Sequence, residues 1–138
     1  MIHPTLDEFR KLASPGALVP VYREILADLE TPVTAYMKIA KDQSYAFLLE
    51  SVEKADAIGR YSFIGANPSV VFRSKGTQVT LIRDGRENGY ESSDPLGELR
   101  TLMAGYKPVS VSGLDGFHGG AVGYMSYDQV RFFEKVPD

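Results

Sequence analysis

Alternating apolar and polar residues between positions 60 and 91 constrain the fold of this chain more than any other feature. Four runs in this stretch have the alternation and the β-branched and aromatic content of strands. The runs are 60–64, 69–73, 78–83 and 87–91. Ser74-Lys75-Gly76 is a turn signal, and Asp84-Gly85 is a hairpin signal. Because short turns join antiparallel neighbours, we expect antiparallel pairing here.

Helix signals lie on both sides of this stretch. Thr5 to Glu8 fits a capping box and predicts a helix over 6–13. Thr31-Pro32 is typical of an N-cap followed by proline, which predicts a helix over 31–41. Asp94-Pro95 opens another helix, for which Gly105 is the expected residue just past the C-cap. Since strands come in runs, we predict an α+β fold with a mainly antiparallel sheet and flanking helices.

Three further segments favour extended structure. The run 45–52 is strongly apolar and ends in polar residues, as a strand leaving a core does. The run 17–22 is apolar and contains a proline, which favours an edge strand or an extended segment. The glycine-rich run 116–128 predicts a strand packed closely against a neighbouring sheet, followed by a helix over 127–134.

Composition limits what this chain can do. Its 138 residues suit one domain. It has no cysteine, which excludes disulfides and thiolate zinc sites and fits a reducing compartment, so we expect the cytoplasm. A net charge of -3 argues against nucleic acid and anionic membrane as partners, and no apolar run reaches the roughly 20 residues of a membrane helix. Only two histidines occur, which leaves little catalytic equipment.

Polar residues at one strand end form the first candidate site. A carboxylate such as Glu50 can bind an ammonium group, and Ser51 can hydrogen-bond a ligand head group. Successive strand residues point to opposite faces, so both reach one ligand only where the strand ends or bulges. Arg60 can pair with a carboxylate and Tyr61 can stack on a ring. From spacing alone, a strand that turns polar as it leaves the core and a surface arginine beside a core tyrosine are the favoured explanations of these residues. A Glu50–Arg60 ion pair is a third explanation.

The glycines near the end of the chain do not form a nucleotide-binding loop. Gly119-Gly120-x-x-Gly123 matches neither the dinucleotide pattern nor the Walker pattern. His118 stands alone in this stretch, whereas a metal site needs three or four converging ligands, so we assign no metal site.

Several segments, in this order, resemble the N-terminal region of anthranilate synthase component I. They are Leu48-Leu49-Glu50-Ser51, Gly59-Arg60-Tyr61-Ser62-Phe63-Ile64-Gly65, Asn67-Pro68 and Gly119-Gly120-Ala121-Val122-Gly123-Tyr124-x-x-Tyr127-Asp128. Pro20 to Glu24 and Thr31 to Val33 also match its usual pattern. The resemblance implies the fold of the chorismate-utilising enzymes, with residues 1–138 as an N-terminal domain whose C-terminal chorismate-binding catalytic region is absent.

The family's chemistry follows from the resemblance. The full-length enzyme is a lyase that converts chorismate and glutamine-derived ammonia to anthranilate and pyruvate with Mg²⁺, beside a glutamine amidotransferase subunit, component II. Its catalytic and Mg²⁺-binding motifs lie outside residues 1–138, so we expect no catalytic residue here and no activity of this chain alone. The resemblance also implies an L-tryptophan feedback site at Leu49, Glu50 and Ser51, which Arg60 and Tyr61 complete.

Two alternatives stay open. The first is the corresponding portion of aminodeoxychorismate synthase component I or of an isochorismate-type relative, since these enzymes share this region more loosely. The second is a free-standing amino-acid-binding module with no catalytic partner in the same chain. If residues 1–138 are instead a fragment of a longer enzyme, the apolar surface left uncovered predicts self-association.

Overall fold

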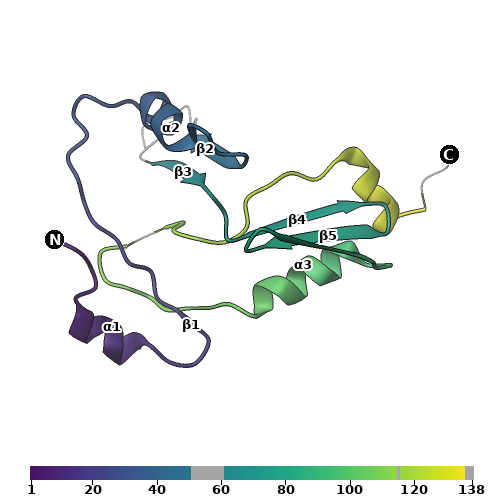
Figure 1. Cartoon of the computed structure of the whole chain (residues 1–138), viewed down its shortest axis with the longest axis horizontal. Helices are drawn as coiled ribbons and strands as arrows, with labels where there is room; N and C mark the ends of the chain where they lie inside the picture. The colour runs from purple at the N-terminus through teal and green to yellow at the C-terminus, as the bar shows by residue number, and fades with distance from the viewer. Residues whose placement is uncertain (51–60, 115, 136–138) are drawn as a thin grey trace.

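The computed structural model describes residues 1–50, 61–114 and 116–135. It has the predicted α+β composition, with antiparallel pairing dominant (Figure 1). In chain order the elements are α1 (Leu6–Leu12), β1 (Ala17–Leu18), α2 (Pro32–Ala40), β2 (Ala46–Glu50), β3 (Ser62–Ala66), β4 (Val70–Lys75), β5 (Gln78–Arg83), β6 (Arg86–Glu91), α3 (Pro95–Ala104), β7 (Lys107–Pro108) and the 3-10 helix η1 (Tyr127–Phe132). The strands of the described ranges form three small sheets, β1–β7, β2–β3 and β4–β5–β6, instead of one.

The three α-helices begin at their predicted caps. The Thr5 amide donates to Glu8 Oε2 at 2.8 Å, and the Glu8 amide donates to Thr5 Oγ1 at 3.4 Å, which completes the capping box of α1. Thr31 caps α2 by accepting from the Thr34 amide at 3.1 Å. Asp94 caps α3 by accepting from the Gly97 amide at 2.9 Å. Side-chain acceptors thus satisfy amide groups that the first helical turn leaves free.

The three-stranded sheet agrees best with the strands that the alternation of apolar and polar residues predicts. β4 pairs antiparallel with β5, and β5 pairs antiparallel with β6. Asp84 and Gly85 join β5 to β6 with φ of 52° and 71°, the left-handed values of a two-residue hairpin turn. α3 runs alongside this sheet (Figure 1), where its Glu98 accepts hydrogen bonds from Ser92 at 3.1 Å and Tyr90 at 3.5 Å.

The hairpin of β2 and β3 carries α2 against it. Phe47 lies opposite Gly65 in the antiparallel register. The Phe47 ring occupies the space that a side chain at position 65 would need. Glycine at 65 therefore lets the aromatic ring cover the backbone of the neighbouring strand.

Three sequence expectations hold only in part or are wrong in detail. In the run 17–22, expected as an edge strand or extended segment, Ala17 and Leu18 form the short strand β1, which pairs parallel to β7, and Tyr22 pairs with His3 in an isolated antiparallel bridge. Gly105 is itself the C-cap of α3 with φ of −69°, because the helix ends in a tighter turn in which the Gly105 amide donates to the Leu102 carbonyl oxygen at 3.3 Å.

The third is the glycine-rich segment, which we expected to be a strand. Residues 116–126, all of which the structure describes, form no strand. Gly116 and Gly120 have φ of 80° and 139°, values that a regular strand does not allow. The helix expected over 127–134 is the short 3-10 helix η1.

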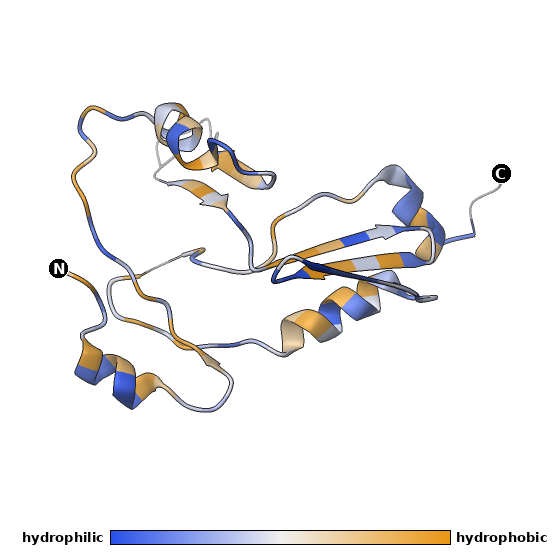
Figure 2. Ribbon diagram, in the orientation of Figure 1, coloured by the Kyte–Doolittle hydropathy of each residue, from blue (hydrophilic) through white to orange (hydrophobic). Residues whose placement is uncertain are grey.

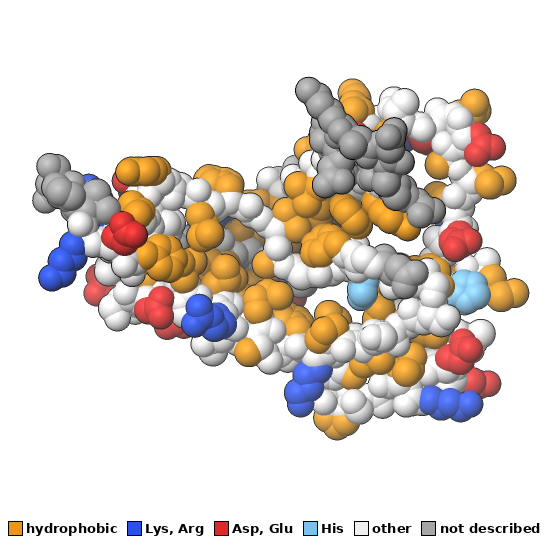
Figure 3. Space-filling view, turned by 180° about the vertical axis from the view of Figure 1, so that it is seen from behind, with side chains coloured by type: hydrophobic (Ala, Val, Ile, Leu, Met, Phe, Trp, Pro, Cys, Tyr) orange, Lys and Arg blue, Asp and Glu red, His pale blue; other side chains and the backbone are white. Residues whose placement is uncertain are grey.

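Much apolar surface is exposed. Of the side chains that the structure describes, only Val79, Pro4 and Pro95 are buried. The accessible surface is 11521 Å², whereas folded monomers of 15.2 kDa expose about 7,100 Å². Figures 2 and 3 show apolar residues spread over the strands, the long segment between β1 and α2, and the outer surface. No helix in the described ranges is long and apolar enough to cross a membrane.

Candidate functional site

An apolar cleft lies between the β2–β3 hairpin and the glycine-rich segment. Its volume is about 370 Å³, within the range of small-molecule sites. Its lining residues are Leu49, Phe63, Phe117, Ala121, Val122 and Gly123. None of these side chains carries a charge or a hydrogen-bonding group, so the cleft suits an apolar or aromatic group.

The strand register decides which side chains reach the cleft. β2 and β3 place Leu49 opposite Phe63, and Glu50 opposite Ser62. Directly paired residues of an antiparallel ladder share a face, and successive residues alternate between faces. Leu49 and Phe63 therefore share the cleft face, while Glu50 and Ser62 belong to the other face.

Three aromatic rings form a row beside the cleft. The Tyr61 and Phe63 rings are stacked, with centroids 6.3 Å apart and planes 28° apart. The Phe63 and Phe117 rings meet edge to face, with centroids 5.5 Å apart and planes 89° apart. Both arrangements are favourable for aromatic quadrupoles. The second contact joins the hairpin to a segment more than fifty positions further along the chain.

The structure brings together two of the five residues named from the sequence. Leu49 lines the cleft, and Tyr61 stacks on the cleft residue Phe63. Glu50 is the last described residue of β2 and is exposed, and alternation assigns its side chain to the face opposite the cleft. Ser51 and Arg60 lie outside the described residues. The assignment of these five to one ligand site stays a prediction.

Phe63, Phe117 and Val122 are cleft residues that sequence reasoning did not select. A signal existed for Phe63, because it is two positions after Tyr61 in a strand and so shares its face. No such signal existed for Phe117 and Val122, because the irregular path of residues 116–126 has no periodicity to read.

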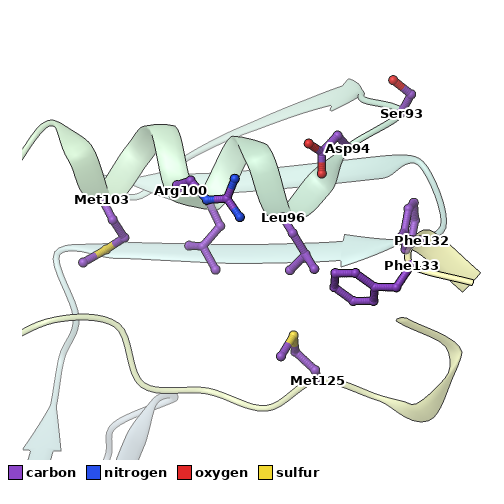
Figure 4. A pocket seen from close by; sticks show the side chains of 9 residues that line it. Ser93, Asp94, Leu96, Arg100, Met103, Met125, Phe132 and Phe133 are labelled. Carbon is purple, nitrogen blue, oxygen red and sulfur yellow. The ribbon is translucent and has the colours of Figure 1, made fainter. Parts of the chain in front are cut away.

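A second, larger groove runs between α3 and residues 125–133 (Figure 4). Its volume is about 570 Å³, and most of its lining is apolar, including Leu96, Met103 and Met125. Asp94 and Arg100 lie at its edge, but the Asp94 carboxylate already caps α3. The groove therefore offers a broad apolar surface with a single cation, and no pair of groups suited to acid–base chemistry.

The described part of the chain does not fit a magnesium site. Mg²⁺ is held by carboxylate and other oxygen ligands in near-octahedral geometry. No group of three or more histidine, aspartate or glutamate side chains converges within the ranges described. No step that depends on a metal is therefore assigned to these residues.

Fold and cleft together define an α+β chain with an apolar, partly aromatic cleft whose lining side chains carry no charge. Its relatives are anthranilate synthase component 1 proteins. That of Synechocystis sp. is 40% identical over 139 residues, covering 99% of this chain and 27% of that protein. The protein of Acetivibrio thermocellus is 37% identical over 139 residues, which cover 100% of this chain and 28% of that protein. The protein of Pseudomonas putida is 41% identical over 131 residues, which cover 94% of this chain and 26% of that protein.

The predicted resemblance is thus confirmed: this chain is a relative of anthranilate synthase component 1 along essentially all of its own length. It spans about a quarter of the length of the curated relatives that it matches. No family model matches the chain.

Proposed function

We propose that this chain is the N-terminal regulatory and structural portion of an anthranilate synthase component I. The complete enzyme would convert chorismate and glutamine-derived ammonia to anthranilate and pyruvate in tryptophan biosynthesis. The observation that carries this proposal is similarity along the whole chain to proteins about four times its length. The exact residues of the Leu-Leu-Glu-Ser and Gly-Arg-Tyr-Ser segments support the anthranilate branch over its looser relatives.

The exposed surface favours a portion of a larger protein over a free-standing module. The chain exposes about 4,400 Å² more than a compact monomer of its mass. A standard protein interface buries only about 800 Å² per partner, so an excess of this size suits a region that completes its core against other parts of one polypeptide. Leu26 and Leu29, exposed at 91% and 97%, are examples of side chains that need such a cover.

The catalytic partners then lie outside these residues. The chorismate-binding region would be another part of the same polypeptide, and it would hold Mg²⁺. Glutamine-derived ammonia would come from component II, the amidotransferase subunit. We expect this assembly in the cytoplasm, in line with the cysteine-free composition.

The proposed ligand of this portion is L-tryptophan, acting as a feedback inhibitor. Glu50 would face the ammonium group, Ser51 would hydrogen-bond the head group and Arg60 would face the carboxylate. Leu49 and Tyr61 would enclose the indole ring. Tryptophan would inhibit by binding preferentially to an unproductive arrangement of the two regions, since a ligand shifts an equilibrium only by its differential affinity.

Calorimetric titration of L-tryptophan tests the ligand. We would titrate the polypeptide as its gene encodes it, then its Glu50→Ala and Ser51→Ala variants, with Asp28→Asn as a control carboxylate outside the proposed site. Loss of a charge-assisted hydrogen bond predicts roughly tenfold weaker binding in Glu50→Ala. Unchanged affinity in both site variants would refute the assignment.

Product analysis tests the branch and the location of catalysis. Chorismate, Mg²⁺ and ammonia are supplied to the encoded polypeptide and separately to residues 1–138. Anthranilate fluorescence from the first alone supports the proposal. Aminodeoxychorismate as the product would favour the alternative family, and turnover by residues 1–138 would overturn the view that catalysis lies elsewhere.

A further inference from the structure

We propose that Asn88 is a site of covalent self-modification, where the side-chain amide is lost as ammonia after attack by the backbone nitrogen of Gly89. Both residues lie on β6, whose residues are exposed apart from Tyr90. The exposed side chains of β6 are polar or charged, so this strand is not part of the apolar surface that needs a cover. The inference is independent of the proposed function, because it involves no ligand.

The sequence contains two asparagines, and they differ in the residue that follows. Asn67 precedes Pro68, and Asn88 precedes Gly89. Cyclisation of an asparagine needs a backbone N–H on the next residue and free access to it. Proline has no N–H, whereas glycine has no Cβ to obstruct the attack and adopts the widest range of backbone conformations. Of the two asparagines, only Asn88 is therefore followed by a suitable nucleophile.

The register of β6 leaves the Gly89 amide without a partner on β5. The Ser92 amide donates to the Thr77 carbonyl oxygen at 2.8 Å, in line with the register of the two strands. Hydrogen-bonded and non-hydrogen-bonded pairs alternate along an antiparallel ladder, so even-numbered residues of β6 bond to β5 and odd-numbered ones do not. Gly89, opposite Thr80, therefore points its amide away from β5. β6 is the outer strand of this sheet in the described ranges, so that side of Gly89 is the open edge.

Local opening of β6 supplies the geometry that the attack requires. The Asn88 side chain is exposed and makes no hydrogen bond within the described ranges, so it is free to rotate. The extended backbone of a paired strand does not bring the side-chain carbon onto the next nitrogen, so the strand must first part from β5. An outer strand with exposed side chains and an internal glycine opens more readily than a central one.

The reaction needs only water besides the protein. The Gly89 nitrogen forms a bond to the side-chain carbonyl carbon of Asn88, and its proton leaves with the amide nitrogen as ammonia. The product is a cyclic succinimide. Water then adds to either ring carbonyl, breaks the bond from that carbon to the Gly89 nitrogen and returns a proton to the nitrogen. One opening gives aspartate, and the other gives isoaspartate, in which the main chain runs through the former side-chain carbon.

Both products change β6. Each adds a negative charge near Glu87 and Glu91. Isoaspartate also lengthens the backbone by a methylene group, which disturbs the pairing of every later residue of the strand. Among these is Tyr90, which lies opposite the buried Val79. The isoaspartate form is therefore expected to lose the pairing of the end of β6 with β5.

Incubation of the encoded polypeptide at mildly alkaline pH, followed by trypsin digestion and mass spectrometry, tests the inference. Cleavage after arginine places Asn88 in peptide 87–100 and Asn67 in peptide 61–73, so each asparagine is followed separately. We expect the mass of peptide 87–100 to rise by the difference between a hydroxyl and an amino group, while that of peptide 61–73 stays constant. Isoaspartyl methyltransferase with labelled S-adenosylmethionine should label peptide 87–100 and not peptide 61–73.

Gly89→Ala and Asn88→Gln are the matched variants. A methyl group at 89 hinders the attacking nitrogen but is accommodated in the fold, since its Cβ would meet only the Val79 carbonyl oxygen at 3.9 Å. Glutamine at 88 keeps the amide but must close a larger, less favourable ring. We expect peptide 87–100 to keep its mass in both variants over the time in which the wild type converts, and circular dichroism confirms that both fold.

Four outcomes would overturn the inference. If peptide 87–100 keeps its mass in the folded polypeptide but converts in urea, pairing with β5 protects Asn88. If it converts in neither state, Asn88 is unreactive. If Gly89→Ala converts as fast as the wild type, the Gly89 nitrogen is not the nucleophile. If Asn67 converts as fast as Asn88, direct hydrolysis by solvent removes the amide and no cyclisation is involved.

Discussion

The Tyr22 hydroxyl donates a 2.9 Å hydrogen bond to the carbonyl oxygen of Ser112, 90 positions further along the chain. Tyr22 also pairs with His3 through two backbone hydrogen bonds of 2.7 and 2.8 Å. The two rings stack with centroids 5.4 Å apart. One residue thus fastens the N-terminus to the segment after β7, and it does so where regular secondary structure is sparse.

Replacing that hydroxyl should loosen the connection without disturbing the ring stack. We expect Tyr22→Phe to lower the free energy of unfolding by about 0.5–1.5 kcal/mol, the usual contribution of one hydrogen bond. Urea unfolding of the encoded polypeptide measures this. Tyr36→Phe is the control, because the Tyr36 hydroxyl makes no hydrogen bond within the described ranges. Equal losses in the two variants would contradict a specific role for Tyr22.

Local signals predicted elements whose stabilising interactions are local. The caps at Thr5, Thr31 and Asp94 and the turn at Asp84-Gly85 each depend on residues a few positions apart, and all are present in the structure. The shortening of the run 17–22 to β1 and the irregular path of residues 116–126 depend on partners far away in the chain. No periodicity within a segment reports such partners.

In the candidate site, too, local signals predicted some features, and contacts between distant parts of the chain determine the others. The placement of Leu49 and Glu50 on a strand followed from the apolar run 45–52. The pairing of Leu49 with Phe63 follows only from the register of β2 and β3, and the contact of Phe63 with Phe117 follows only from tertiary structure.

The Phe47 ring over Gly65 makes a sharp packing prediction. Gly65→Ala should destabilise the protein by about 1–3 kcal/mol, because the added methyl group overlaps the ring. Combining it with Phe47→Leu should recover part of that loss, and a double-mutant cycle measures the coupling. Gly89→Ala is the matched control in β6, where the new Cβ would meet only the Val79 carbonyl oxygen at 3.9 Å. Strictly additive effects at 47 and 65 would refute the predicted overlap.

The hairpin turn between β5 and β6 predicts different tolerance at its two residues. Gly85→Ala should cost about 1–2 kcal/mol, because φ of 71° is unfavourable for a residue with a Cβ. Asp84→Asn should be nearly neutral, since both residues suit the first position of this turn. Thermal unfolding of the two variants measures the difference, and a comparable loss in both would show that backbone conformation does not limit this turn.

Glu30 should make stability depend on acid pH. Hydrogen bonds from Lys38 and then Thr34, the latter at 2.9 Å, hold the pKa of the Glu30 carboxyl below its ordinary 4.5. A carboxyl whose folded pKa is lowered stabilises the fold above its unfolded pKa, and this contribution is lost as the pH falls through the folded value.

Comparison of Glu30→Gln with wild type across pH measures that contribution. At about pH 6 the variant should be the less stable, and by about pH 3 the difference should shrink, because the wild-type carboxyl then takes up a proton. Asp28→Asn is the control, since Asp28 has no hydrogen bond or ion pair with any residue that the structure describes. A Glu30→Gln deficit that is the same at both pH values would mean that side-chain packing, and not the ionised hydrogen bonds to Lys38 and Thr34, stabilises the start of α2.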